Sequence, residues 1–165
     1  MIIGFIIIMI ILSAQFQSIK QPLIIGLAIP LSFIGVIFGL MVTRVPFGIM
    51  AFFGVVALMG VVVNDAIVLI SYVNDLRREG MNVRDSLIKA GRNRLRPIIL
   101  TTVTTLAGMI PLSLNLAGGA EYWRPLAVSL IFGLAVSSFL TLVVVPVLYS
   151  LIESRKERRQ MEALA

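Results

Sequence analysis

A polar pair, Asn64 and Asp65, lies inside a long apolar stretch of the sequence that runs from Gly60 to Ile70. An Asp at the centre of a membrane-spanning helix costs about 2.5–3.5 kcal/mol on insertion scales, which flanking apolar residues can offset. Such a side chain must face protein or water, and intramembrane carboxylates commonly serve proton or ion pathways. We expect Asp65 to belong to a proton or ion relay. The alternative is a buried hydrogen bond that fixes helix packing.

A second apolar stretch carries hydroxyl groups that could take part in the same chemistry. Thr101 and Thr105 are four residues apart and share a helix face with Gly108. For each single threonine, packing is the simpler interpretation, because hydroxyls in membrane helices often bond to backbone or to a neighbouring helix. Arg94 lies at the start of this stretch, where a cation can pair with a carboxylate or anchor the helix at the interface.

Several kinds of chemistry are excluded by composition. The sequence contains no cysteine and no histidine, so disulfides, thiolate or imidazole metal ligands and histidine-based catalysis are absent. It also lacks the H-E-x-x-H, G-x-S-x-G and P-loop motifs. We therefore predict no enzymatic activity, no metal site and no cofactor.

Five apolar runs position these residues, at approximately 1–16, 23–43, 47–73, 97–117 and 125–152. Hydrophobic residues make up 59% of the 165 residues and charged residues 13%. Soluble domains average about 45–50% and about 25%. A 21-residue run such as 23–43 forms a helix of about 31 Å, close to the thickness of the bilayer hydrocarbon. We predict an all-α membrane protein with five transmembrane helices in one domain, 1–152, followed by a basic cytoplasmic tail, 153–165.

The longest polar connection, 75–96, is predicted to form a cytoplasmic amphipathic helix. Gly80 interrupts it, and Asn82 with Asp85 three residues later resembles a capping pattern. The apolar side of this helix consists of Val83, Leu87 and Ala90.

Cations gather on one side of the predicted topology. The 75–96 connection carries seven Lys or Arg residues and the tail carries four. Five crossings place both segments and the 17–22 link on the same side, which then holds 12 of the 14 cations and leaves Arg44 and Arg124 opposite. The positive-inside rule therefore predicts a cytoplasmic C-terminus and an external Met1. Charges placed in this way report membrane orientation, so no nucleic-acid partner is predicted.

Small residues recur at the spacing that allows helices to pack closely in a membrane. Gly35 and Gly39 form a G-x-x-x-G pair, and Gly133 with Ser137 repeats the spacing. We predict helix-packing roles for these four residues.

The first run is the least typical. Its 16 residues reach about 24 Å, somewhat less than a bilayer. No Lys or Arg precedes it, which argues against a signal peptide. We expect the chain to be part of a longer transporter. The alternative is a small helical membrane subunit with a scaffolding or regulatory role.

Four motifs, taken in order, resemble the resistance–nodulation–division (RND) efflux pumps, and most closely their acriflavine-resistance, multidrug branch. They are GVVVNDAIVLI from Gly60, RNRLRPIILTT from Arg92, GMIPL from Gly108 and VVVPVLY from Val143. The similarity covers nearly the whole chain and corresponds to the eighth to twelfth helices of a twelve-helix protein.

This resemblance implies a permease of the bacterial inner membrane that exports drugs or other amphiphilic compounds in exchange for protons. It implies a trimer that joins a periplasmic adaptor and an outer-membrane channel, with the proton gradient as energy source. A lipid exporter or protein-export relative of the same superfamily is the alternative. Metal export is the less favoured substrate class, because the chain has no His or Cys.

The family's relay couples an Asp pair on the fourth helix with a Lys, an Arg and a Thr. By motif, Asn64 takes the Lys position, Arg94 the Arg and Thr101 the Thr, while Asp65 falls where many relatives carry Asn. Asn64 cannot hold a charge, so the resemblance implies that coupling here depends more on Asp65. The Asp pair and the periplasmic drug-binding domains are not in this sequence, and we expect no pumping by the chain alone.

Overall fold

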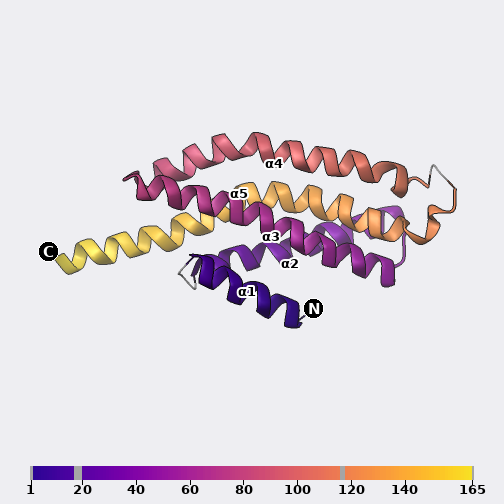
Figure 1. Ribbon diagram of the computed structural model, residues 1–165, viewed down its shortest axis with the longest axis horizontal. Coiled ribbons are helices and arrows are strands. Elements are labelled where there is room, and N and C mark those ends of the chain that lie inside the picture. The colour runs from indigo at the N-terminus through magenta and orange to yellow at the C-terminus, as the bar shows by residue number, and fades with distance from the viewer. Residues whose placement is uncertain (1, 17–19, 116–117, 165) are drawn as a thin grey trace.

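The structure is a computed structural model that describes residues 2–16, 20–115 and 118–164. Within these ranges all regular secondary structure is helical, which confirms the predicted all-α fold (Figure 1). The helices are α1 (Ile2–Phe16), α2 (Lys20–Thr43), α3 (Ile49–Arg78), α4 (Val83–Ser113), the short 3-10 helix η1 (Ala120–Tyr122) and α5 (Arg124–Leu164).

Four helices of the described part are long and apolar enough to cross a membrane. These spans are Gln21–Thr43, Ile49–Arg78, Val83–Ser113 and Arg124–Leu151. Helix α1 has 15 residues, and a helix of that length reaches about 22 Å, short of the ~30 Å hydrocarbon core. It lies at the edge of the bundle against α2 (Figure 1). A membrane span at residues 1–16, which would bring the number of spans to five, therefore stays a prediction.

The turn between α3 and α4 is built around Gly80, as expected. Gly80 has φ +91°, a left-handed conformation that costs glycine little. Its N–H donates to the carbonyl of Arg77 at 3.0 Å, and the N–H of Met81 donates to the carbonyl of Leu76 at 3.2 Å. This pair of bonds is a Schellman motif, which satisfies the last carbonyls of α3 and reverses the chain.

Helix α4 differs from the expectation of a connecting helix followed by a separate span at residue 97. It begins after Asn82 and continues through Pro97 to Ser113. Proline removes one backbone donor and crowds the preceding turn, which bends a helix without necessarily ending it. Figure 1 shows α4 arching over the other helices. The predicted apolar side is present, since Val83 and Ala90 are buried and Leu87 packs against the same core.

Helix α5 is the central element, because α2, α3 and α4 all pack against it. Its contact with α2 depends on glycine. A Cβ atom on Gly35 would lie 2.6 Å from the backbone oxygen of Phe132, so the two helices approach too closely for any larger residue. Gly39 faces the ring of Phe132. Two of the predicted packing glycines thus lie where α2 meets α5.

The remaining predicted packing residues are on α5. Gly133 faces the side chains of Leu58 on α3 and Val36 on α2. Ser137 is buried, and its hydroxyl donates to the carbonyl of Leu134 in its own helix at 3.1 Å. Gly133 therefore lies where three helices converge, whereas Ser137 contributes its small size and not a bond to another helix.

A polar cluster joins three helices at the end of the bundle that carries the α3–α4 turn. Gln21 and Asn74 exchange two amide hydrogen bonds, at 3.1 and 2.9 Å. The hydroxyl of Tyr149 donates to the same Asn74 oxygen at 2.8 Å. These bonds connect α2, α3 and α5, and each satisfies polar groups that are costly to leave unpaired in an apolar environment.

Candidate functional site

Asp65 lies near the middle of α3, at the edge of the face that packs into the bundle, and is half-buried. Leu58, Leu69 and Tyr72 share its flank of the helix by their spacing of seven and four residues. No hydrogen bond from another residue of the described part reaches the Asp65 carboxylate. The carboxyl group is therefore available to water, an ion or a further protein segment.

Asn64 lies on a different side of the helix from Asp65. Consecutive helical residues point about 100° apart, and Asn64 is exposed on the outer surface of α3. The structure therefore separates the predicted polar pair: Asp65 borders the bundle, and Asn64 faces away from it.

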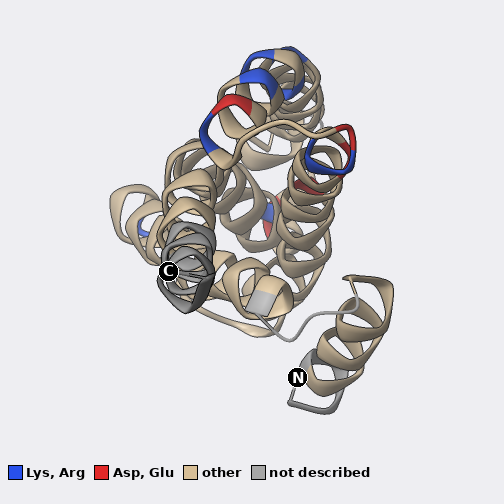
Figure 2. Ribbon diagram, turned by 90° about the vertical axis from the view of Figure 1, so that its left-hand side faces the viewer, with Lys and Arg blue, Asp and Glu red and all other residues tan. Residues whose placement is uncertain are grey.

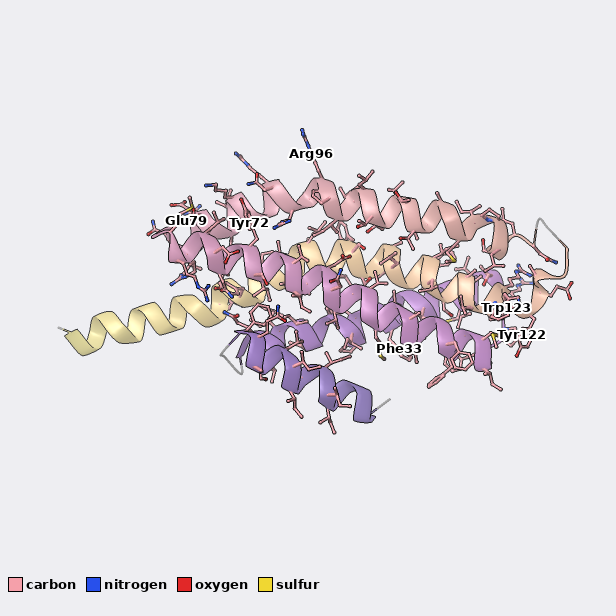
Figure 3. The ribbon with its side chains drawn as sticks, in the orientation of Figure 1. Phe33, Tyr72, Glu79, Arg96, Tyr122 and Trp123 are labelled. Atoms are coloured by element: carbon pink, nitrogen blue, oxygen red, sulfur yellow. The ribbon has the colours of Figure 1, made fainter. Side chains whose placement is uncertain are left out.

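Arg94 is held by an aromatic ring, and among the side chains that the structure describes no carboxylate pairs with it. Its guanidinium carbon lies 4.7 Å from the centroid of the Tyr72 ring, and the side-chain amide of Asn93 donates to the Tyr72 hydroxyl at 2.8 Å. In Figure 3, Tyr72 lies where α3 passes beneath α4, whereas Arg96 points away from the bundle. Two consecutive residues of α4 thus contact one aromatic side chain of α3.

Thr101 is exposed, and its hydroxyl bonds within its own helix. It donates to the carbonyls of Pro97 at 3.2 Å and of Ile98 at 3.0 Å. This is the backbone bonding that threonine commonly makes in helices. In the described part of the chain, no hydrogen bond or ion pair joins any two of Asn64, Asp65, Arg94 and Thr101.

The antiparallel pair α3 and α4 nevertheless fixes the relative positions of these residues along the helix axes. Tyr72 is level with Asn93 and Arg94, and α3 and α4 run antiparallel. Seven residues further along each helix therefore place Asp65 level with Thr101, about 10 Å from Arg94 along the axis. Asp65 and Arg94 therefore lie beyond direct hydrogen-bond reach of each other, and a relay that involves both would need intermediate groups between them.

A buried hydroxyl pair that was not predicted from the sequence lies next to Asp65 and Thr101 in depth. The hydroxyls of Thr102 and Ser138 lie 2.9 Å apart and join α4 to α5. Thr141, one turn further along α5, is also buried. The signal was the run of small polar residues in the last apolar segment. Which neighbouring threonine faces inward depends on the rotation of α4, and the sequence does not fix that rotation.

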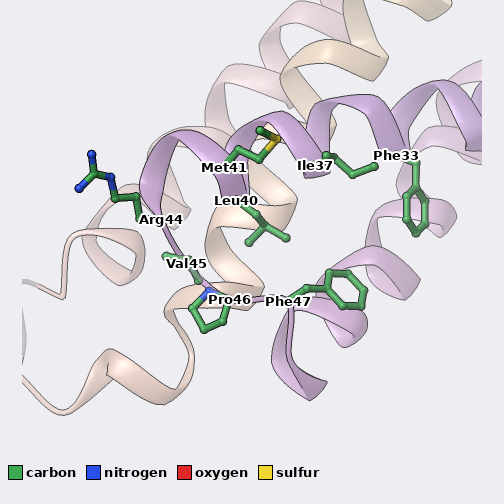
Figure 4. A pocket seen from close by; sticks show the side chains of 8 residues that line it. All are labelled: Phe33, Ile37, Leu40, Met41, Arg44, Val45, Pro46 and Phe47. Carbon is green, nitrogen blue, oxygen red and sulfur yellow. The ribbon is translucent and has the colours of Figure 1, made fainter.

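Charged residues cluster at one end of the bundle. Figure 2 looks onto the end with the α3–α4 turn and shows Lys and Arg on the adjoining ends of α3 and α4. At the other end, α2 and the segment that follows it line an apolar groove of about 560 Å³; Figure 4 shows the residues that line it. Phe33 and Phe47 lie on one side of this groove, and the side chain of Arg44 extends away from it.

Comparison with known proteins identifies the family. The model of the AcrB/AcrD/AcrF family matches residues 1–153. This chain belongs to that family of RND transporters. The family model and the four long apolar helices together describe a multi-pass membrane protein.

Similar proteins include the cobalt-zinc-cadmium resistance protein CzcA of Cupriavidus metallidurans, with 36% identity over 94% of this chain. The swarming motility protein SwrC of Bacillus subtilis has 35% identity over 93% of this chain. The multidrug resistance protein MdtC of Erwinia tasmaniensis has 34% identity over 90% of it. This chain spans 15% of the length of each of these three relatives.

The fold agrees with part of a solved structure. A crystal structure of a heavy metal efflux pump matches with a TM-score of 0.82 and 30% sequence identity, over 91% of this chain and 15% of that one. The arrangement of helices around α5 is therefore that of a segment found in complete efflux pumps.

Proposed function

We propose that this chain forms part of the membrane domain of a proton-driven RND efflux transporter that exports drugs or other amphiphilic compounds. The observation that carries the proposal is Asp65, a half-buried carboxylate within a helix long enough to cross the membrane. Such a residue costs about 2.5–3.5 kcal/mol on insertion scales, and the energy of a proton gradient can be coupled only through a group that titrates within the membrane.

In this proposal Asp65, Arg94 and Thr101 line the relay, and Asn64 occupies the position where the family carries a Lys. The depth order supports a path in which Asp65 and Thr101 lie level with each other and Arg94 lies towards the charged end. The gap of about 10 Å along the axis calls for water or for carboxylates from the rest of the transporter. The chain alone would therefore not pump.

Asp65→Asn tests this role in a complete transporter that contains the chain. We expect gradient-driven export to fall by at least about tenfold, because an amide cannot carry the proton. Efflux of ethidium and proton counterflow would be measured in vesicles. Asp75→Asn is the matched control, since Asp75 is an exposed carboxylate near the end of the same helix. Unchanged export and proton flux in Asp65→Asn, with Asp75→Asn also unchanged, would remove Asp65 from the mechanism.

The proposal includes a location and partners. The basic end of the bundle would face the cytoplasm of a bacterial cell from the inner membrane, with the C-terminus on the same side. The complete transporter would assemble as a trimer with a periplasmic adaptor and an outer-membrane channel. The lipid bilayer and the rest of the transporter chain would surround these helices, the proton gradient would supply the energy, and no nucleic acid or bound cofactor would be needed.

Export of heavy-metal cations is a second candidate. It is favoured by the 36% identity to CzcA and by the match to a heavy metal efflux pump. A sensitive bacterial strain that expresses the complete transporter separates the two. Raised tolerance to ethidium without raised tolerance to zinc or cobalt supports amphiphile export, and the reverse pattern supports metal export.

A further inference from the structure

Tyr72 connects α3 to α4 through two different contacts. Its ring lies under the guanidinium of Arg94 at 4.7 Å, and its hydroxyl accepts a hydrogen bond from the Asn93 amide at 2.8 Å. Arg96, only two residues further on, points away from the bundle into the surroundings (Figure 3). Of these two α4 arginines, Arg94 is the one fixed against α3.

The chemistry of this contact matters because a ring and a carboxylate hold a cation differently. A carboxylate neutralises the charge it binds, whereas an aromatic face attracts the guanidinium through its quadrupole and leaves the net charge intact. No ion pair to Arg94 is found in the described part of the chain. Arg94 is therefore held in place while its positive charge stays available to an anionic group.

The hydrogen bond from Asn93 determines how the ring is presented. With the hydroxyl fixed to α4, the ring has little freedom to rotate away from the neighbouring Arg94. A Leu at position 72 would place a smaller apolar side chain against α4, which also packs in lipid. It would offer neither the quadrupole nor the acceptor, so simple packing does not account for a tyrosine.

We propose that Tyr72 is a positioning residue for Arg94: it holds the guanidinium on the α3 side of α4 without neutralising its charge. This inference rests on the proposed function, because the value of a fixed, uncompensated cation lies in the proton relay. Tyr72 itself takes no part in proton transfer in this proposal. Its effect on transport passes through Arg94.

The experiment uses the complete transporter containing this chain, in vesicles with an imposed pH gradient, and measures ethidium efflux per folded protein. We expect Tyr72→Leu to reduce efflux by about tenfold, within the range set by cation–π contacts. Tyr72→Phe keeps the ring face and should retain most of the activity. Arg96→Gln is the charge-matched control and should transport normally.

A graded series separates positioning from packing. Incorporation of phenylalanine with one, two or three ring fluorines at position 72 weakens the quadrupole while hardly changing the shape. Efflux should fall stepwise along this series, and the pH gradient needed for half-maximal efflux should rise. Equal efflux at every fluorine number would overturn the proposal, even if Tyr72→Leu fails to fold.

Arg94→Gln separates the positioning role of Tyr72 from the relay role of Arg94. Loss of efflux in Arg94→Gln together with normal efflux in Tyr72→Leu would overturn the positioning role and leave the relay standing. Normal efflux in Arg94→Gln would overturn both. In the double variant Tyr72→Leu/Arg94→Gln, a loss no larger than that of Arg94→Gln alone supports action through Arg94, and an additive loss contradicts it.

Discussion

Arg44 and Asn115 are two non-glycine residues with a left-handed backbone, and the structure gives them different roles. Arg44 has φ +55° and ends α2, with its N–H bonded to the carbonyl of Met41. Asn115 has φ +53°, and its side-chain oxygen accepts a bond from the N–H of Ala120 at 2.8 Å. At Asn115 the side-chain hydrogen bond offsets the backbone strain and stabilises the loop after α4. The Arg44 side chain makes no comparable bond in the described part of the chain.

This difference predicts opposite responses to glycine. Arg44→Gly should stabilise the protein by about 1 kcal/mol, because glycine adopts the left-handed region without steric cost. Asn115→Gly relieves the same strain but loses a bond, so it should be neutral or destabilising. Thermal unfolding in detergent would compare the two. A lower melting temperature for Arg44→Gly than for the parent would contradict this explanation of the α2 end.

The sequence singles out candidate residues by their chemistry, whereas their contacts depend on how the helices are aligned, and these candidates stay predictions. Asp65 was identified because a carboxylate in an apolar run is rare and costly. The Tyr72–Arg94 contact was not identified, because it depends on the register of α3 against α4 across the Gly80 turn. Tyr72 lies eight residues before Gly80 and Asn93 thirteen residues after it, so counting outward from the turn does not pair them.

Among the elements, α2 and α5 depend most directly on small residues. Gly35 lies so close to α5 that an added methyl group would meet both the Phe132 carbonyl at 2.6 Å and the Val136 Cβ at 2.7 Å. The backbone oxygen of Phe132 cannot rotate away from an added methyl group as a flexible side chain can. To accommodate the methyl group, α2 and α5 must therefore move apart.

Gly35→Ala should destabilise the bundle by about 1–3 kcal/mol, the usual cost of overpacking a tight contact. Gly108→Ala is the matched control, because nothing lies within 4 Å of a Cβ at that position on α4. It should be neutral or slightly stabilising, since alanine is the better helix former. Guanidinium or thermal unfolding in detergent gives both values, and equal effects would show that close approach is not the cause.

The boundaries of the elements were predicted with uneven success. The interruption at Gly80 and the start of a helix after Asn82 were expected and are found, whereas α3 runs to Arg78, beyond the expected end of the third span at residue 73. The Asn82 amide contacts the Asp85 carboxylate at 3.3 Å and makes no cap bond to the backbone. The continuity of α4 through Pro97 was missed, because packing against α5 outweighs the local preference of proline to end a helix.

At the scale of the whole molecule, the distribution of charge predicts an orientation that labelling can check. The chain has no cysteine, so each introduced cysteine is unique. Glu79→Cys lies in the α3–α4 turn and Glu121→Cys in η1, at opposite ends of the bundle; both wild-type side chains are exposed. In spheroplasts, a membrane-impermeant maleimide should label Glu121→Cys and spare Glu79→Cys. Labelling of both positions in intact spheroplasts would contradict the proposed topology.

Helix α4 is packed differently from the other long helices. Of its most apolar stretch 11% is buried, against 44–50% in the other three spans. Arg94 contacts Tyr72 of α3 near one end of α4, and Thr102 bonds to Ser138 of α5 further along the helix. Pro97 lies between these two contacts. An element with few buried contacts has the lowest local stability, and motion concentrates there. In this bundle by itself, amide hydrogen exchange should therefore be fastest in α4, and bending of this helix would centre on Pro97, where one backbone hydrogen bond is missing.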